Sequence, residues 1–131
     1  MSAPYGEVVA DHARHPRNRG RFDAPHVAHE GLNPLCGDRV RLELQLAQGR
    51  ISAARFDGEA CMVALAAASL LTELLPGLSP EDARALPDER LLSALQATLR
   101  PSRVACATLP LQVLREALAT APFRESPGSA G

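Results

Sequence analysis

Three cysteines and one aspartate are the residues of this sequence whose types and positions suggest chemistry. Cys36 and Asp38 stand two residues apart in the segment Asn33–Arg39, while Cys61 and Cys106 follow far downstream. Thiolates bind zinc and iron and accept sulfur, and a carboxylate adds a harder oxygen ligand. The segment is therefore interpreted as half of a metal or sulfur site, which is complete only if the two distant thiols converge on it.

The composition limits the classes of protein to which the chain can belong. Its 131 residues with 46% apolar content suit one domain, which we expect over residues 1–121, before a disordered tail over 122–131. The formal charge of −1 and the pI near 6.4 indicate neither a general nucleic-acid binder nor a membrane-surface protein. Neither a signal core nor an apolar run long enough to span a bilayer is present, which favours a cytoplasmic protein.

The cysteine count narrows the chemistry further. An odd number of cysteines in a reducing compartment does not predict a disulfide framework. Metal binding, sulfur chemistry and the separate burial of three unrelated thiols remain, and burial alone is common for free cysteines. Two features argue against burial alone: all three thiols are expected at loops or helix starts, and an unpaired aspartate is unfavourable in an apolar core.

The clearest local pattern is a hairpin. Residues Arg39–Ala47 alternate apolar and polar side chains, and Arg50–Asp57 resume the alternation after a glycine-containing turn. Cys36 and Cys61 lie just outside these two segments. The hairpin is therefore expected to bring the two thiols to the same end of the sheet.

Helical spacing and turn residues predict the other elements. We expect a helix over Pro4–Arg14, a weakly patterned edge strand over Ala24–Glu30, and helices that start after Cys61, at Ser79-Pro80, around Leu91–Leu99 and at or just after Cys106. Pro110 sets the start of the last helix, because proline is tolerated only in the first turn. Cys61 and Cys106 would then occupy helix starts, where the helix dipole lowers a thiol pKa.

The basic segment His12–Gly20 has two interpretations. Its turn formers and arginines are typical of a solvated loop, and the alternative is a docking patch for an acidic partner surface. His12 follows an apolar helical stripe, so we expect a core or capping residue rather than a metal ligand.

Several motifs in a fixed order resemble one known family, the U-type iron–sulfur cluster scaffold proteins, which include the NifU N-terminal domain, IscU and SufU. The resemblance covers most of residues 5–118. It rests on Asp11-His12, Pro16-Arg17-Asn18, Gly20, Asn33-Pro34, Cys36-Gly37-Asp38, Phe56–Cys61, Ser69, Arg103 and Cys106-Ala107-Thr108-Leu109.

The resemblance implies an α+β fold, with a three-stranded antiparallel sheet and helices packed around one face, as in SufE and NifU. It also implies a site built from Cys36, Asp38, Cys61 and Cys106, which would bind iron in a transient [2Fe-2S] cluster or a zinc ion. Such a scaffold accepts sulfur from a cysteine desulfurase and iron from a donor, and passes the cluster to apo iron–sulfur proteins. Asp38 would be the labile ligand, because a carboxylate is harder than a thiolate.

Two alternatives stay open within this family. The first is a SufU-like zinc-dependent sulfurtransferase, in which Cys36 or Cys106 accepts a persulfide and Arg103 supports the reaction. The second is a non-catalytic regulator that binds a desulfurase. Whether the protein is an enzyme stays open, and a scaffold or sulfur carrier is favoured over a classical enzyme.

The sequence also departs from the family at named positions. Ala105 stands where the IscU branch has a histidine, and the proline-valine-lysine chaperone motif of that branch is missing. Ala60 replaces a usual glycine, and Met62 opens a segment that is usually small and hydroxylated. The first two departures leave open whether a specialised chaperone is recruited, and the last two would make the site tighter and drier.

Overall fold

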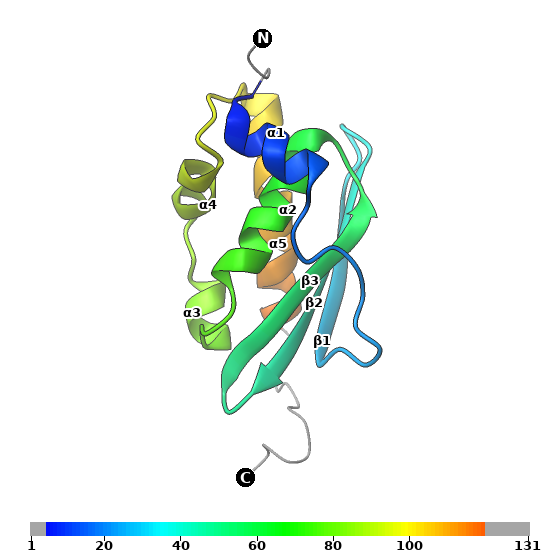
Figure 1. The fold of residues 1–131 in the computed structure, drawn as a ribbon, viewed down its shortest axis with the longest axis vertical. Coiled ribbons are helices and arrows are strands. Elements are labelled where there is room, and N and C mark those ends of the chain that lie inside the picture. The colour runs from blue at the N-terminus through cyan, green and yellow to red at the C-terminus, as the bar shows by residue number, and fades with distance from the viewer. Residues whose placement is uncertain (1–4, 120–131) are drawn as a thin grey trace.

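The protein is an α+β fold in which a three-stranded antiparallel sheet is covered on one face by helices (Figure 1). The computed structural model describes residues 5–119. Its elements, in chain order, are α1 (Glu7–Arg14), β1 (Val27–Asn33), β2 (Asp38–Ala47), β3 (Arg50–Glu59), α2 (Met62–Leu74), α3 (Pro80–Arg84), α4 (Asp88–Leu95) and α5 (Pro101–Ala119). The expected fold class is confirmed. The tail expected at 122–131 lies outside the described residues. The first helix begins at Glu7, after Gly6 with φ 91°, and therefore later than the expected start at Pro4.

The sheet has the order β1-β2-β3, and its central hairpin is the predicted one. Strands β2 and β3 pair from Arg39 opposite Glu59 to Ala47 opposite Arg50. Leu42 and Leu44, at inward positions of β2, are 1% exposed, because the alternating pattern puts one face of the strand on the core. The edge strand β1 lies three residues later than expected, and it pairs with β2 along its whole length.

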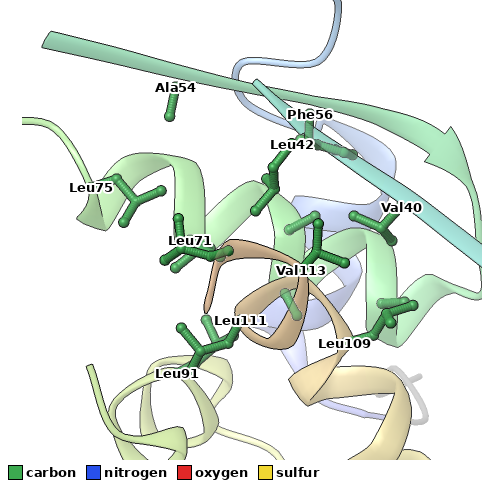
Figure 2. Packing of buried hydrophobic residues seen from close by; sticks show 14 of the residues in the cluster. Val40, Leu42, Ala54, Phe56, Leu71, Leu75, Leu91, Leu109, Leu111 and Val113 are labelled. Carbon is green, nitrogen blue, oxygen red and sulfur yellow. The ribbon is translucent and has the colours of Figure 1, made fainter. Parts of the chain in front are cut away.

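Helices α2 and α5 form the centre of the core, between the sheet and the short helices α3 and α4 (Figure 1). Helix α2 is buried on nearly every side, and four of its buried residues are alanines: Ala64, Ala66, Ala67 and Ala68. These small side chains let α5 approach closely, and Figure 2 shows Leu71 of α2 and Val113 of α5 beneath Leu42 and Phe56 of the sheet.

Close packing also holds α5 against the edge strand. Gly31 in β1 faces Val113, and a Cβ added at this glycine would lie 2.5 Å from the Cγ2 atom of Val113. The absence of a side chain at this position therefore fixes α5 directly against β1. No helix within residues 5–119 is long and apolar enough to cross a membrane.

The boundaries of two further helices, α5 and α4, also differ from the sequence-based expectation. Helix α5 begins at Pro101 rather than at or after Cys106, so Pro110 lies inside the helix. Pro110 is buried among core residues, so tertiary packing outweighs the loss of one backbone hydrogen bond. Helix α4 ends at Leu95, because Gln96 adopts a left-handed conformation with φ 51°, and Leu99 therefore lies outside it.

The basic segment after α1 is a loop that two hydrogen bonds hold to α2. The backbone N–H of Arg17 donates to the Ser69 hydroxyl at 2.8 Å, and the Asn18 side chain donates to the Thr72 hydroxyl at 3.2 Å. The Arg17 side chain pairs with Asp11 at 2.7 Å. The segment is therefore a largely exposed loop, as one interpretation expected, but it is held to α2 at these two positions. Docking of a partner by this segment stays a prediction.

His12 is a buried residue of the α1–α2 contact, as expected from its apolar surroundings. It is 7% exposed, and its Nδ1 atom lies 2.7 Å from the hydroxyl oxygen of Ser69. The loss of solvent on burial lowers the pKa of His12, and the nearby Arg17 lowers it further. The folded state therefore favours the neutral imidazole, with Nδ1 free to accept the Ser69 proton.

We predict that this histidine makes the fold sensitive to acid. Because the pKa of His12 is lowered on folding, the unfolded state binds a proton that the folded state does not, and stability falls as pH drops below about 6.5. Urea unfolding at pH 7.5 and pH 5.5 should show a larger loss for the wild type than for His12→Gln. An equal loss in the two proteins would contradict this role.

Candidate metal centre

The turn between β1 and β2 carries Cys36 at its tip and Asp38 at its end. Asn33 and Asp38 are paired across the turn, and the Cys36 N–H donates to the Asn33 carbonyl at 3.2 Å. Gly37 has φ 69°, a left-handed conformation that glycine adopts without strain. The turn therefore exposes the Cys36 thiol and buries the Asp38 side chain, which is 2% exposed.

Asp38 connects this turn to the start of α2. Its Oδ1 atom accepts the backbone N–H of Cys61 at 2.8 Å, and its Oδ2 atom lies 3.9 Å from the Cys61 sulfur. Cys61 is the N-cap residue of α2, as the sequence predicted, so the free amide at the helix start has a carboxylate partner. One carboxylate oxygen is thus fixed by the backbone, while the other faces a thiol.

Cys106 reaches the same place from inside α5. Its sulfur is 3.2 Å from the sulfur of Cys36, and the residue is fully buried. The Asn33 side-chain amide lies 3.8 Å from the Cys106 sulfur on another side, and the Ser102 carbonyl lies 3.7 Å away. The exposed thiol of Cys36 therefore lies directly over the buried thiol of Cys106.

The expectation of a low pKa at Cys106 is wrong. The residue lies more than one turn inside α5, so the free amides of the helix start are not beside it. Burial raises the pKa of its thiol, and the neighbouring side chains of Cys36, Asp38 and Cys61 raise it further. In the metal-free protein Cys106 is therefore a protonated thiol.

Arg103 supplies the positive charge nearest to these sulfurs. Its Nη1 atom lies 4.0 Å from the Cys106 sulfur. The hydrogen bond to Cys106 raises the pKa of Arg103, and the proximity of Tyr5 and Cys61 adds to this effect. The permanent positive charge of the Arg103 guanidinium at this position stabilises negative charge that develops on the Cys106 sulfur.

The donor atoms fit a small tetrahedral metal site. The side-chain ligand atoms of Cys36, Asp38 and Cys106 all lie within 4.8 Å of one another. Around zinc, with Zn–S near 2.3 Å and Zn–O near 2.0 Å, ligand atoms are about 3.5–3.8 Å apart. The 3.2 Å between Cys36 and Cys106 and the 3.9 Å from Cys61 to Asp38 are close to these values.

The structure thus brings Cys36, Asp38 and Cys106 together, and Cys61 lies beside them, with its sulfur 3.9 Å from Asp38. Sequence reasoning gave no role to Asn33 or Tyr5, which lie beside the Cys106 and Arg103 side chains. The only local signal for Asn33 was its position before a proline in the turn. The proximity of Asn33 to Cys106 depends on how β1 packs against α5, and that of Tyr5 to Arg103 on where the segment before α1 lies, and neither follows from a local pattern.

Comparisons with known proteins place the chain among related sequences. A family model described as the NifU-like N terminal domain matches residues 4–126. The chain is 32% identical to the zinc-dependent sulfurtransferase SufU of Bacillus subtilis, with 88% of this chain and 89% of that protein covered. It is 34% identical to the iron-sulfur cluster assembly scaffold protein IscU of Escherichia coli K12, with 88% of this chain and 91% of that protein covered.

A solved structure shows a similar fold. The putative iron-sulfur cluster assembly scaffold protein for the SUF system from Fervidobacterium islandicum superposes with a TM-score of 0.75. The match covers 87% of this chain and 96% of that one, at 23% identity. At this level of identity the likeness concerns the fold alone.

The site end of the hairpin depends on Gly58, which pairs with Val40. Gly58 has φ 136°, and a Cβ there would lie 2.1 Å from the Arg39 carbonyl oxygen. We predict that Gly58→Ala lowers the free energy of unfolding by at least about 2 kcal/mol and weakens zinc binding, because the chain from Gly58 to Cys61 must move away from Asp38.

Gly49→Ala is the matched control for this variant. Gly49 also has a positive φ of 76°, but nothing lies within 4 Å of its added Cβ, and it occupies the opposite end of the hairpin. It should lose about 1 kcal/mol and bind zinc normally. Urea unfolding and zinc titration of both variants would test this, and equal zinc affinity in the two would refute the positioning role of Gly58.

Proposed function

Since the chain belongs to the NifU-like N-terminal domain family, we propose that it is an iron–sulfur cluster assembly scaffold. One observation carries this proposal: the donor atoms of Cys36, Asp38 and Cys106 lie within 4.8 Å of one another, with the Cys61 thiol 3.9 Å from Asp38. Three thiols and one carboxylate are a suitable donor set for iron. The iron–sulfur cluster is the cargo of this site.

The burial of the ligands suggests an order of events. Cys36 is exposed and meets an incoming partner first, whereas Cys106 lies buried beneath it. Leu35, next to Cys36, is 94% exposed and provides an apolar contact at the entrance. A cysteine desulfurase that delivers sulfur at this end would reach Cys36 before it reached any other thiol.

The sulfur step can be written for Cys36 without an external reductant. The Cys36 thiolate attacks the terminal sulfur of the desulfurase persulfide, a new S–S bond forms at Cys36, and the desulfurase cysteine leaves as a thiolate. The number of electrons is conserved, since sulfane sulfur is transferred without reduction. Cluster formation then needs iron from a donor and electrons from a reductant.

Asp38 makes the scaffold suitable for release rather than storage. Its Oδ1 atom remains hydrogen-bonded to the Cys61 amide, which leaves Oδ2 to bind and leave the metal. A carboxylate is a harder ligand than a thiolate and exchanges more readily on iron in a sulfur-rich site. The proposed acceptors of the cluster are apo iron–sulfur proteins.

A zinc-dependent sulfurtransferase is the second candidate, and the position of Arg103 favours it. The Arg103 guanidinium lies 4.0 Å from the Cys106 sulfur. It can therefore balance the negative charge of the cysteine sulfurs when Cys36 has left the metal. In this reaction zinc would be held by Asp38, Cys61 and Cys106 while Cys36 leaves to accept sulfur. When bound, zinc would stabilise the cysteines as thiolates, and it would supply nothing else to the reaction.

The following experiment tests the proposal and separates the candidates. The protein is purified without oxygen, its iron and zinc are measured, and it is reconstituted with iron, cysteine and a cysteine desulfurase. We expect an iron–sulfur chromophore that moves to an apo-ferredoxin. Tight zinc with chelator-sensitive stimulation of the desulfurase, but no transferable chromophore, would instead identify a sulfurtransferase. Desulfurase binding with neither metal nor chromophore would identify a regulator.

Removal of the carboxylate should slow the release of the cluster. In Asp38→Ala the labile ligand is gone, so the reconstituted cluster should persist longer and transfer to apo-ferredoxin several-fold more slowly than in the wild type. Asp38→Asn is the matched variant, because its side-chain oxygen can still accept the Cys61 amide and support the fold. Wild-type transfer rates in both variants would overturn the role of Asp38.

A further inference from the structure

A polar pocket lies at the start of α5, near the Cys106 thiol. It has a volume of about 440 Å³ and is lined by Tyr5, Thr98, Arg100, Ser102 and Arg103. This volume is within the usual range for sites that bind small molecules and exceeds the needs of a single ion. The proposed scaffold chemistry makes no use of this pocket.

The charge of the pocket is positive and unbalanced. Two of its five lining residues are arginines, and none is an aspartate or glutamate. The Arg100 carbonyl accepts backbone hydrogen bonds from Arg103 and Val104. Within residues 5–119, the Arg100 side chain forms no hydrogen bond or ion pair. In contrast, Arg17, Arg39 and Arg115 each pair with a carboxylate within 3.1 Å. Two guanidinium groups that line one pocket give it a positive potential, which favours the binding of an anion.

The other lining groups suit the same kind of ligand. Tyr5, Thr98 and Ser102 carry hydroxyl groups, which donate hydrogen bonds to oxygen atoms. Guanidinium groups bind carboxylates and phosphates through paired N–H donors. The pocket therefore matches a small polar molecule that bears one of these two oxyanions.

Arg103 connects the pocket with the thiols. Its Nη1 atom lies 4.0 Å from the Cys106 sulfur, while the residue also lines the pocket. A guanidinium has five N–H donors, so one group can serve both neighbours. An anion in the pocket would neutralise part of the charge that Arg103 presents to Cys106.

We propose that this pocket binds a small oxyanionic molecule, with a carboxylate or phosphate group on Arg100 and Arg103, and that its occupancy is coupled to the metal cargo. The coupling rests on the proposed function. Four anionic ligands outweigh a divalent metal ion, so the loaded site is negatively charged and competes with the anion for Arg103. Each ligand therefore weakens the binding of the other by the same factor.

Calorimetric titration of the reduced, metal-free protein tests the pocket. Citrate represents the carboxylate source, inorganic phosphate represents the phosphate source, and sodium chloride at matched ionic strength is the blank. We expect at least one of the two oxyanions to bind with one-to-one stoichiometry, and its affinity should fall as salt is added. Whichever binds identifies the class of the ligand, and failure of both overturns the proposal.

Two variants locate the binding site. Arg100→Gln should weaken the binding of the oxyanion about tenfold, because it removes one charge-assisted contact. Arg84→Gln removes the same charge from α3, which lies toward the other end of α5 (Figure 1). This control should bind like the wild type. Unchanged affinity in Arg100→Gln would overturn the assignment of the pocket.

The same titration on zinc-loaded protein tests the coupling. We expect the affinity for the oxyanion to fall several-fold, and equal affinity in the loaded and metal-free proteins would overturn the coupling while leaving the pocket. A protein that takes up no metal would overturn the proposed function and the coupling together. In that case the Arg100→Gln titration would still decide whether the pocket binds an anion.

Discussion

The hydrogen bond from the Cys61 backbone to the Asp38 carboxylate is the contact on which the site depends. It joins the first residue of β2 to the first turn of α2, and it explains how a carboxylate that is only 2% exposed is tolerated beside the core. Without it, the buried charge would lack a partner, and the start of α2 would have a free amide. The Asp38 side chain thus has two roles: Oδ1 accepts the structural hydrogen bond, and Oδ2 is the candidate metal ligand.

The packing of α5 brings the Cys106 sulfur to the same site. Alanines on the buried surface of α2 and the missing side chain at Gly31 let α5 lie close to both α2 and the edge strand. This closeness places Cys106 3.2 Å from Cys36, on a turn that otherwise projects into solvent. The rigid helices hold the inner thiol, while the turn presents the outer one, which is the arrangement that a site for receiving and releasing cargo needs.

The sequence predicted the parts of this arrangement that local patterns control. The alternation in β2 and β3 fixed the hairpin, and the hairpin placed Cys36 and Cys61 at one end of the sheet. The position of Cys106 could not be predicted from local pattern, because Pro110 indicated a helix start that core packing moved back to Pro101. For the same reason the raised pKa of Cys106 was missed: it follows from burial by side chains that are distant in the sequence.

X-ray absorption spectroscopy of the zinc-loaded protein would show whether Cys36, Asp38, Cys61 and Cys106 act as one donor set, because the scattering of neighbouring atoms distinguishes sulfur from oxygen and nitrogen. We expect one zinc per chain, with three sulfur neighbours at about 2.3 Å and one oxygen neighbour at about 2.0 Å. Fewer than three sulfur neighbours, or zinc below one equivalent per chain, would contradict this expectation.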